Sequence, residues 1–93
     1  MIGFAGVLTS GRGIVASGVV TGNSVSDSGA TGMAIGQGST VIGNTAEGNR
    51  VFGFDVICPS NVTDNTALNN GSLIGGNLRL NGNGCTNTNN VAP

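Results

Sequence analysis

Short apolar pieces recur along the chain and are separated by polar turn residues. Ile14-Val15-Ala16 and Val56-Ile57-Cys58 are two of these pieces, and Gly, Asn, Ser and Pro punctuate the sequence around them. Apolar residues never keep a helical period over the roughly ten residues that a helix needs. Val, Ile and Thr, which favour strands, dominate where order is expected. The pattern therefore predicts an all-β chain built from very short strands.

The short strands belong to an internal repeat. Asn23, Asn44 and Asn65 follow one another at an interval of 21 residues. Four further rows keep this interval: Ile14, Ile35 and Val56; Val20, Val41 and Val62; Phe4, Val25, Ala46 and Ala67; Gly11, Gly32 and Gly53. A fixed period of roughly 20 to 50 residues is typical of solenoids and other repeat architectures.

The interval changes after the third repeat. We expect one extra residue in the segment from Asn69 to Gly76, in a turn where a change of length is tolerated. The row of Asn23, Asn44 and Asn65 would then continue to Asn87, and Val56 to Leu78, at an interval of 22. The chain is predicted to be one domain, residues 1–93, with a partial first coil over 1–12, regular coils over 13–76, and a last coil with a C-terminal cap over 77–93.

One repeat cannot fold alone. Burial of four aliphatic side chains contributes roughly 6 to 12 kcal/mol, whereas ordering the backbone of one repeat costs roughly 20 to 40 kcal/mol. Stacked coils pair each strand with its equivalent in the next coil, about 4.8 Å away, and share one continuous core. The sequence therefore predicts about four stacked β-coils of 21 to 22 residues.

Two sets of residues resemble a known superfamily. Asn23, Asn44, Asn65 and Asn87 resemble the asparagine ladder of right-handed parallel β-helices of the pectate-lyase-like superfamily. Asn tolerates left-handed backbone angles, and its amide can both donate to and accept from an identical amide one coil away. Cys58-Pro59-Ser60-Asn61-Val62, Asn77-Leu78-Arg79-Leu80 and Gly84-Cys85 are similar to the closing coils of uncharacterised bacterial right-handed β-helix repeat proteins. The resemblance implies a right-handed parallel β-helix, but not an activity, because the superfamily includes lyases, hydrolases, tailspikes and adhesins.

The charge of the chain excludes several partners. The formal net charge is -1, 8% of residues are charged, and there is no Lys. Nucleic acids and anionic membranes, which select clustered positive charge, are therefore not expected partners. No apolar run approaches the roughly 20 residues of a membrane-spanning helix, so we expect no membrane insertion. The first residues lack a basic region, so we expect no signal peptide within this chain.

Catalysis would have to come from seven charged side chains. They are Asp27, Glu47, Asp55, Asp64, Arg12, Arg50 and Arg79. Among the four acids, Asp27 and Glu47 are expected to approach each other on adjacent coils, and no neighbour is evident that would tune their pKa values. His is absent, which removes the usual zinc and nucleophile schemes. We predict no enzymatic activity, no metal and no cofactor, and we expect Asp55 and Arg79 to form a surface ion pair.

The two cysteines leave two readings open. Cys58 is aligned with Ala16, Gln37 and Leu80 in an apparently inward row, where a free thiol would be a small buried apolar group. Alternatively, Cys58 and Cys85 form a disulfide that closes a loop of 27 residues and contributes about 3 to 4 kcal/mol. A disulfide would fit an extracellular or cell-surface location.

The function predicted first is a structural or assembly module. A short solenoid exposes unpaired strands at its ends, so we expect a homo-oligomer or a head-to-tail stack. The alternative is a set of closing coils in a carbohydrate-binding or polysaccharide-processing protein, with Phe52 and Phe54 as an exposed sugar-stacking patch. Ice binding is disfavoured, because the polar rows Ser24, Thr45, Thr66, Thr88 and Thr21, Ile42, Thr63 flank a turn instead of sharing one plane.

Overall fold

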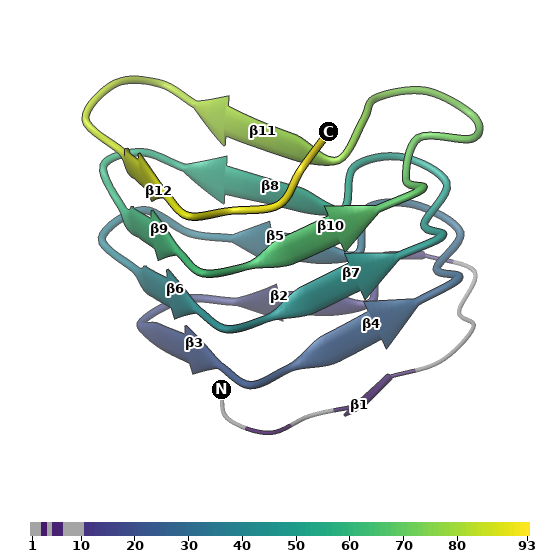
Figure 1. Ribbon diagram of the computed structural model, residues 1–93, viewed down its shortest axis with the longest axis horizontal. Helices are drawn as coiled ribbons and strands as arrows, with labels where there is room; N and C mark the ends of the chain where they lie inside the picture. The colour runs from purple at the N-terminus through teal and green to yellow at the C-terminus, as the bar shows by residue number, and fades with distance from the viewer. Residues whose placement is uncertain (1–2, 4, 7–10) are drawn as a thin grey trace.

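The computed structural model describes residues 3, 5–6 and 11–93 and forms a parallel β-solenoid of about four turns (Figure 1). The strands are β1 (Ala5–Gly6), β2 (Ile14–Ala16), β3 (Val19–Thr21), β4 (Ser24–Ser26), β5 (Met33–Ile35), β6 (Thr40–Ile42), β7 (Thr45–Glu47), β8 (Phe54–Ile57), β9 (Asn61–Thr63), β10 (Thr66–Leu68), β11 (Leu78–Asn81) and β12 (Thr86–Thr88). No helix occurs among these described residues. The predicted all-β solenoid is confirmed.

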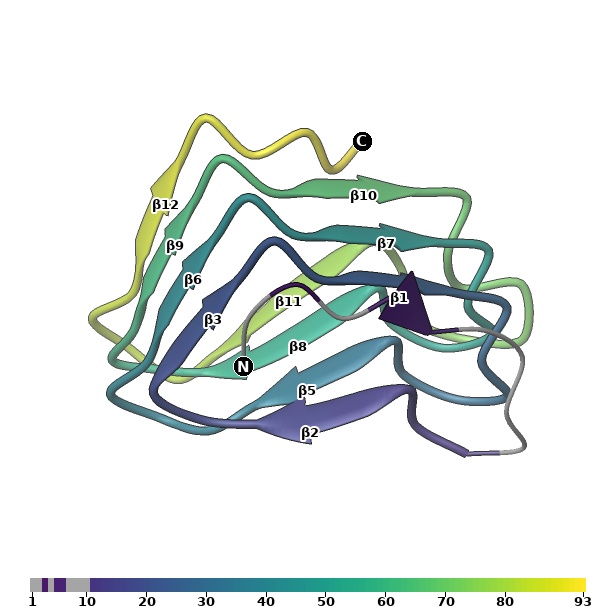
Figure 2. The same cartoon turned by 90° about the horizontal axis from the view of Figure 1, so that it is seen from below.

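Each full coil contributes one strand to each of three sheets. The sheet orders are β1-β4-β7-β10, β2-β5-β8-β11 and β3-β6-β9-β12, and all neighbouring strands are parallel. Figure 2 looks along the stack and shows the three sheets as the sides of a closed outline. Strands of only two to four residues suffice because each is paired with its equivalent in the next coil.

The core is a stack of identical or similar side chains in the middle of this outline. Val20, Val41 and Val62 lie directly above one another and have no exposed surface. Val25, Ala46 and Ala67 form a second buried row on the neighbouring sheet. Both rows have the predicted members at the predicted interval, because the turns that join these sheets have the same length in the first three coils.

The third sheet departs from the predicted register in the first coil. Ile14 pairs with Met33, and Ala16 with Ile35, so the interval there is 19 residues instead of 21. The turn between β2 and β3 holds residues 17–18, whereas the equivalent turn between β5 and β6 holds residues 36–39. The shorter turn slides β2 by two positions, and the row predicted to start at Gly11 starts at Gly13. The row predicted to start at Phe4, which lies outside the described residues, has Gly6 beside Val25.

The last coil also departs from its predicted register. Leu80, and not Leu78, pairs with Val56, and Asn87 pairs with Val62. The loop between β10 and β11, residues 69–77, is three residues longer than the loop between β7 and β8, residues 48–53. Its tip exposes Leu73 and Ile74, which are 62% and 68% accessible. The predicted single extra residue was wrong because the loop bulges outward before it returns to the coil.

Candidate functional site

One corner of the solenoid carries an asparagine ladder that runs the length of the described coils. Its members are Asn23, Asn44, Asn65 and Asn90. In each step, the Oδ1 atom of one Asn accepts hydrogen bonds from the backbone N–H and the Nδ2 amide of the Asn before it, at 2.9 to 3.0 Å. The first three members are the predicted ones.

The predicted fourth member, Asn87, is not part of this ladder. It stands in the core-facing row that begins with Val20, Val41 and Val62, and its side chain is exposed. The ladder position falls to Asn90, 25 residues after Asn65. The reason is that the loop at residues 69–77 adds three residues and the corner between β11 and β12, residues 82–85, adds one compared with residues 58–60 in the coil before.

A second corner carries a ladder that was not predicted from the sequence. Ser28, Asn49, Asn70 and Asn77 follow one another there, with the Asn side chains hydrogen-bonded at 2.8 to 3.0 Å. Asn77 follows Asn70 by only seven residues, because the loop between them leaves the coil and comes back. The interval of 21 between Asn49 and Asn70 was a usable signal.

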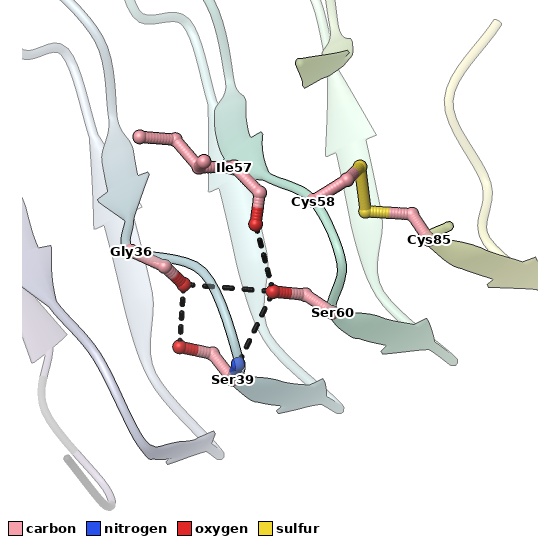
Figure 3. The surroundings of a disulfide bond; sticks show 6 residues. All are labelled: Gly36, Ser39, Ile57, Cys58, Ser60 and Cys85. Atoms are coloured by element: carbon pink, nitrogen blue, oxygen red, sulfur yellow. Dashed lines mark hydrogen bonds between the residues drawn. A yellow bond between two sulfur atoms is a disulfide. The ribbon is translucent and has the colours of Figure 1, made fainter. Parts of the chain in front are cut away.

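The third corner combines a serine ladder with the disulfide (Figure 3). The Oγ atom of Ser60 accepts from the amide of Ser39 at 3.1 Å, and that of Ser39 accepts from the amide of Gly18 at 3.0 Å. Cys58 and Cys85 are joined by a disulfide that ties the end of β8 to the start of β12. Cys58 is buried, whereas Gln37, which had been aligned with it as an inward residue, is exposed in a turn.

These corners use the buried polar groups of the described residues. Every buried side-chain nitrogen or oxygen in this part of the chain has a hydrogen-bond partner. The partners are mostly equivalent residues one coil away, so the polar interior serves coil-to-coil cohesion. Unpaired polar groups aimed into a cleft, which would indicate a ligand, are not found among the described side chains.

The predicted charged candidates lie on the surface. Asp27 donates its backbone N–H to the carbonyl of Glu47 at 3.1 Å, and both side chains are exposed. Within residues 11–93 and the described residues before them, no three His, Cys, Asp or Glu side chains gather as a metal site would require. Asp55 and Arg79 form a two-pronged ion pair, with N–O distances of 2.6 and 2.9 Å.

The two candidate aromatic residues do not form an exposed patch. Phe54 is only 1% accessible and stands in the core row between Met33 and Leu78. Phe52 is partly exposed, but the guanidinium of Arg79 lies 4.5 Å from the centre of its ring. The hydrogen bond to Asp55 is the main cause that raises the pKa of Arg79, burial opposes the rise, and the carboxylate charge adds to it. The predicted sugar-stacking pair is therefore wrong for Phe54, and the ring of Phe52 is covered on one face.

The polar surface rows also change membership. Ser24, Thr45 and Thr66 are aligned on one sheet, but the next position is Val91 and not Thr88. Thr88 pairs with Thr63 and extends the row of Thr21 and Ile42 on the neighbouring sheet. The shift follows from the same longer loop and longer corner that displaced Asn87.

A shallow trough lies on the outer face of β2, β5 and β8. Its volume is about 220 Å³, and it is lined by Arg12, Val15, Ala34, Ile35, Gly36, Asp55 and Ile57. Val15 and Ile57 are 68% and 44% accessible, whereas Ile35 is buried, and the lining also includes one arginine and one aspartate. The lining is mainly apolar and holds no cluster of catalytic groups.

The ends of the solenoid differ in how their strands are covered. At the first end, β1 pairs with β4, and the carbonyl of Thr21 in β3 accepts from the amide of Gly3. Within the described residues, strand β2 is paired with β5 alone. The amide of Ile14 and the carbonyl of Ala16 bond toward β5, so the amide and carbonyl of Val15 between them point away from the stack.

At the last end, β10 is covered and two strands are not. Val91 forms a bridge with Thr66 and exchanges backbone hydrogen bonds with Asn65 and Ala67. In the part of the chain that the structure describes, β11 pairs only with β8, and β12 only with β9. Leu78, Leu80 and Ala92 are partly buried against the core at this end. Among the described strands, both ends thus present unpaired strand edges, β2 at the first end and β11 and β12 at the last.

None of the protein-family models, curated proteins or solved structures compared with the chain matches it. Among the residues that the structure describes, there is also no helix of the length and apolar character needed to cross a membrane.

Proposed function

We propose that this chain is a non-catalytic structural and assembly module that associates with a second copy through the end of its first coil. The observation that carries the proposal is the open edge of β2, where the Val15 amide and carbonyl point away from the stack. Unpaired edge strands are templates for the addition of a further strand. Burial of the polar interior in coil-to-coil ladders supports a structural role over a catalytic one.

The apolar character of this edge favours a protein partner. Val15 is 68% accessible and lies beside the buried Ile14 and the partly buried Ala16. A strand added under β2 would satisfy the Val15 backbone groups and cover this apolar surface at the same time. We propose a second copy of the chain as this partner, since homo-oligomers are the commonest assemblies.

Sedimentation velocity over a wide concentration range tests the proposal. We expect a mass above that of the 9.0 kDa monomer that rises with concentration. In Val15→Pro the edge N–H is lost, but no hydrogen bond to β5 is removed, so the fold is expected to persist and the association to weaken. Val15→Ala is the matched control, because it shortens the same side chain and keeps the amide.

The result that would overturn the proposal is a monomer at every concentration. Equal association in Val15→Pro and Val15→Ala would place the contact elsewhere and would equally contradict the role of this edge. Circular dichroism and thermal unfolding of each variant show whether a change in mass reflects the edge or a loss of fold.

A second candidate function is carbohydrate binding, as part of the closing coils of a polysaccharide-binding β-helix protein. The observation that favours it is the trough between Arg12 and Asp55 on the outer face of β2, β5 and β8. A glycan array tests it, with Arg12→Ala and Ile57→Ala as variants that line the trough and Arg50→Ala as a surface control. Absence of any bound glycan, or equal binding by all variants, would reject it.

We also propose that the chain belongs with the right-handed parallel β-helix proteins of the pectate-lyase-like superfamily and acts outside the cell. The asparagine ladder of Asn23, Asn44 and Asn65 supports the first part. The Cys58–Cys85 disulfide supports the second, because disulfides persist in oxidising compartments. Mass spectrometry of the protein from its source, with and without thiol alkylation, tests whether the bridge forms there.

A further inference from the structure

Glycines occupy equivalent positions in successive coils, where the next coil stacks closely on the backbone. Gly13, Gly32 and Gly53 precede the first core residue of β2, β5 and β8. A Cβ atom on Gly13 or Gly32 would lie 2.8 Å from the carbonyl oxygen of the next coil, and one on Gly53 would lie 2.6 Å from it. Contacts this short with backbone do not occur, so only glycine lets the next coil stack at this position.

The last coil breaks this rule. The residue that follows in the row is Asn77, whose carbonyl accepts from the amide of Phe54 at 2.9 Å, as the carbonyl of Gly53 does from Met33. A further coil stacked on the last one would bring its own carbonyl to the place where Asn77 carries a side chain. Asn77 therefore obstructs at this point the stacking that glycine permits in the coils before it.

A second row is broken in the same coil. Val20, Val41 and Val62 fill the core from coil to coil, and the next residue in this row is Asn87. A further coil would cover the Asn87 amide and force it to find partners in an apolar core. Burial of an amide without hydrogen-bond partners is unfavourable, so a coil over Asn87 would be disfavoured.

The two asparagine ladders are also closed at this end. The Nδ2 atom of Asn90 donates to Oδ1 of Asn87 at 2.6 Å and to the carbonyl of Val62 at 2.8 Å. In Asn65 the same atom donates to the next ladder residue. At the second corner, Nδ2 of Asn77 donates to the carbonyl of Pro93 at 2.7 Å instead of to a further ladder residue. The Nδ2 atoms of both terminal Asn residues thus donate to groups other than a further ladder residue.

We infer that the last coil, residues 77–93, is a built stop that prevents a second copy of this chain from stacking on that end. Asn77 obstructs by its side chain, Asn87 by its polarity, and both hold the ladder ends closed. The inference rests on the proposed function in one respect, since it assigns assembly to the first-coil end. Without such a stop, the exposed edges of β11 and β12 would favour open-ended stacking.

The stop can be opened by two substitutions. Asn77→Gly restores the glycine row and Asn87→Val restores the valine row. Asn77→Ala combined with Asn87→Asp is the matched control, because alanine loses the same side-chain amide but keeps a Cβ, and aspartate keeps a polar group and an acceptor for Asn90. The single variant Asn87→Val is carried alongside in case the double variant does not fold.

Amide hydrogen exchange of Leu78 and Leu80 is the readout. The carbonyls of Asn77 and Asn81 accept hydrogen bonds from the amides of Phe54 and Cys58, so these carbonyls point toward β8. Backbone groups alternate in direction along a strand, so the amides of Leu78 and Leu80 point away from β8. In the opened variant we expect these two amides to exchange about tenfold more slowly at high than at low protein concentration. In the wild type and in the matched control we expect no dependence on concentration.

Concentration-dependent protection of Leu78 and Leu80 in the wild type would overturn the inference. So would a folded opened variant, double or single, whose two amides stay unprotected at every concentration. If the proposed function is wrong, the wild type is monomeric and the Val15 amide at the first-coil end is unprotected from exchange. The two failures are therefore distinguished by amides at opposite ends of the molecule.

Discussion

The two ends of the solenoid are built from the same repeat and treat it differently. The first coil has the glycine and the valine that stacking requires, Gly13 and Val20, and the backbone groups of Val15 point away from the stack. In the last coil, Asn77 and Asn87 replace those residues. The difference shows that a repeat residue is retained for what stacks on it. Where nothing stacks, the position is free to take up another role.

The largest expected effect compares an interior ladder residue with a terminal one. Asn44 accepts from Asn23 and donates to Asn65 and to two carbonyls, all within buried surroundings. Asn44→Ala is expected to lower the free energy of unfolding by about 4 kcal/mol, because several buried groups lose their partners. Asn90→Ala should lower the free energy of unfolding by about 1 to 2 kcal/mol, because water can reach the hydrogen-bonding groups that lose Asn90 as a partner. Urea unfolding measures both, and equal losses would contradict the distinction between interior and end.

The next effect concerns the disulfide that fastens the last coil. Cys58→Ser with Cys85→Ser is expected to lower the free energy of unfolding by about 3 kcal/mol, since the bridge closes a loop of 27 residues. Hydrogen exchange should accelerate in β11 and β12 and stay unchanged in β2 and β5. Reduced wild-type protein serves as the control and should match the variant. An even acceleration over all strands would show that the bridge does not act on the last coil in particular.

A smaller effect is expected from the glycine row. Gly53→Ala should lower the free energy of unfolding by about 2 kcal/mol, because the added Cβ would lie 2.6 Å from the carbonyl of Asn77. Gly76→Ala, where no atom lies within 4 Å of the added Cβ, is the matched control and should change it by less than about 0.5 kcal/mol. Similar melting temperatures for the two variants would refute the steric account of stacking.

The smallest effect is expected at the surface ion pair of the last two coils. The folded state raises the pKa of Arg79, so any stability from this group is present below its ordinary pKa and is lost only as the pH rises through the raised value. Stability should therefore not respond to this group at neutral pH. Asp55→Asn is expected to change the melting temperature only slightly, and the difference should vanish at high salt. A large, salt-independent change would contradict a surface role for the pair.

The fold and the interior part of the ladder could be predicted because their signals are local and repeated. Asn23, Asn44 and Asn65 share one interval, and the valine row shares it too, so each agrees with the other. The surface pair of Asp55 and Arg79 followed from the same stacking. Phe54 was misplaced although it lies two residues before the core residue Val56, a spacing that puts both side chains on the same face of a strand.

The sequence by itself determined that short strands would stack into a solenoid, since a coil of this composition cannot bury enough apolar surface alone. Only the tertiary structure decided the register at the two ends. Interval counting assumes turns of constant length, whereas the turn at residues 17–18 is short and the loop at residues 69–77 is long. Those two changes moved Gly13 into the glycine row, brought Asn77 to Asn70 and put Asn90 in place of Asn87. Backbone hydrogen bonds between coils fix such a register, and they join residues whose separation along the chain carries no signal of its own.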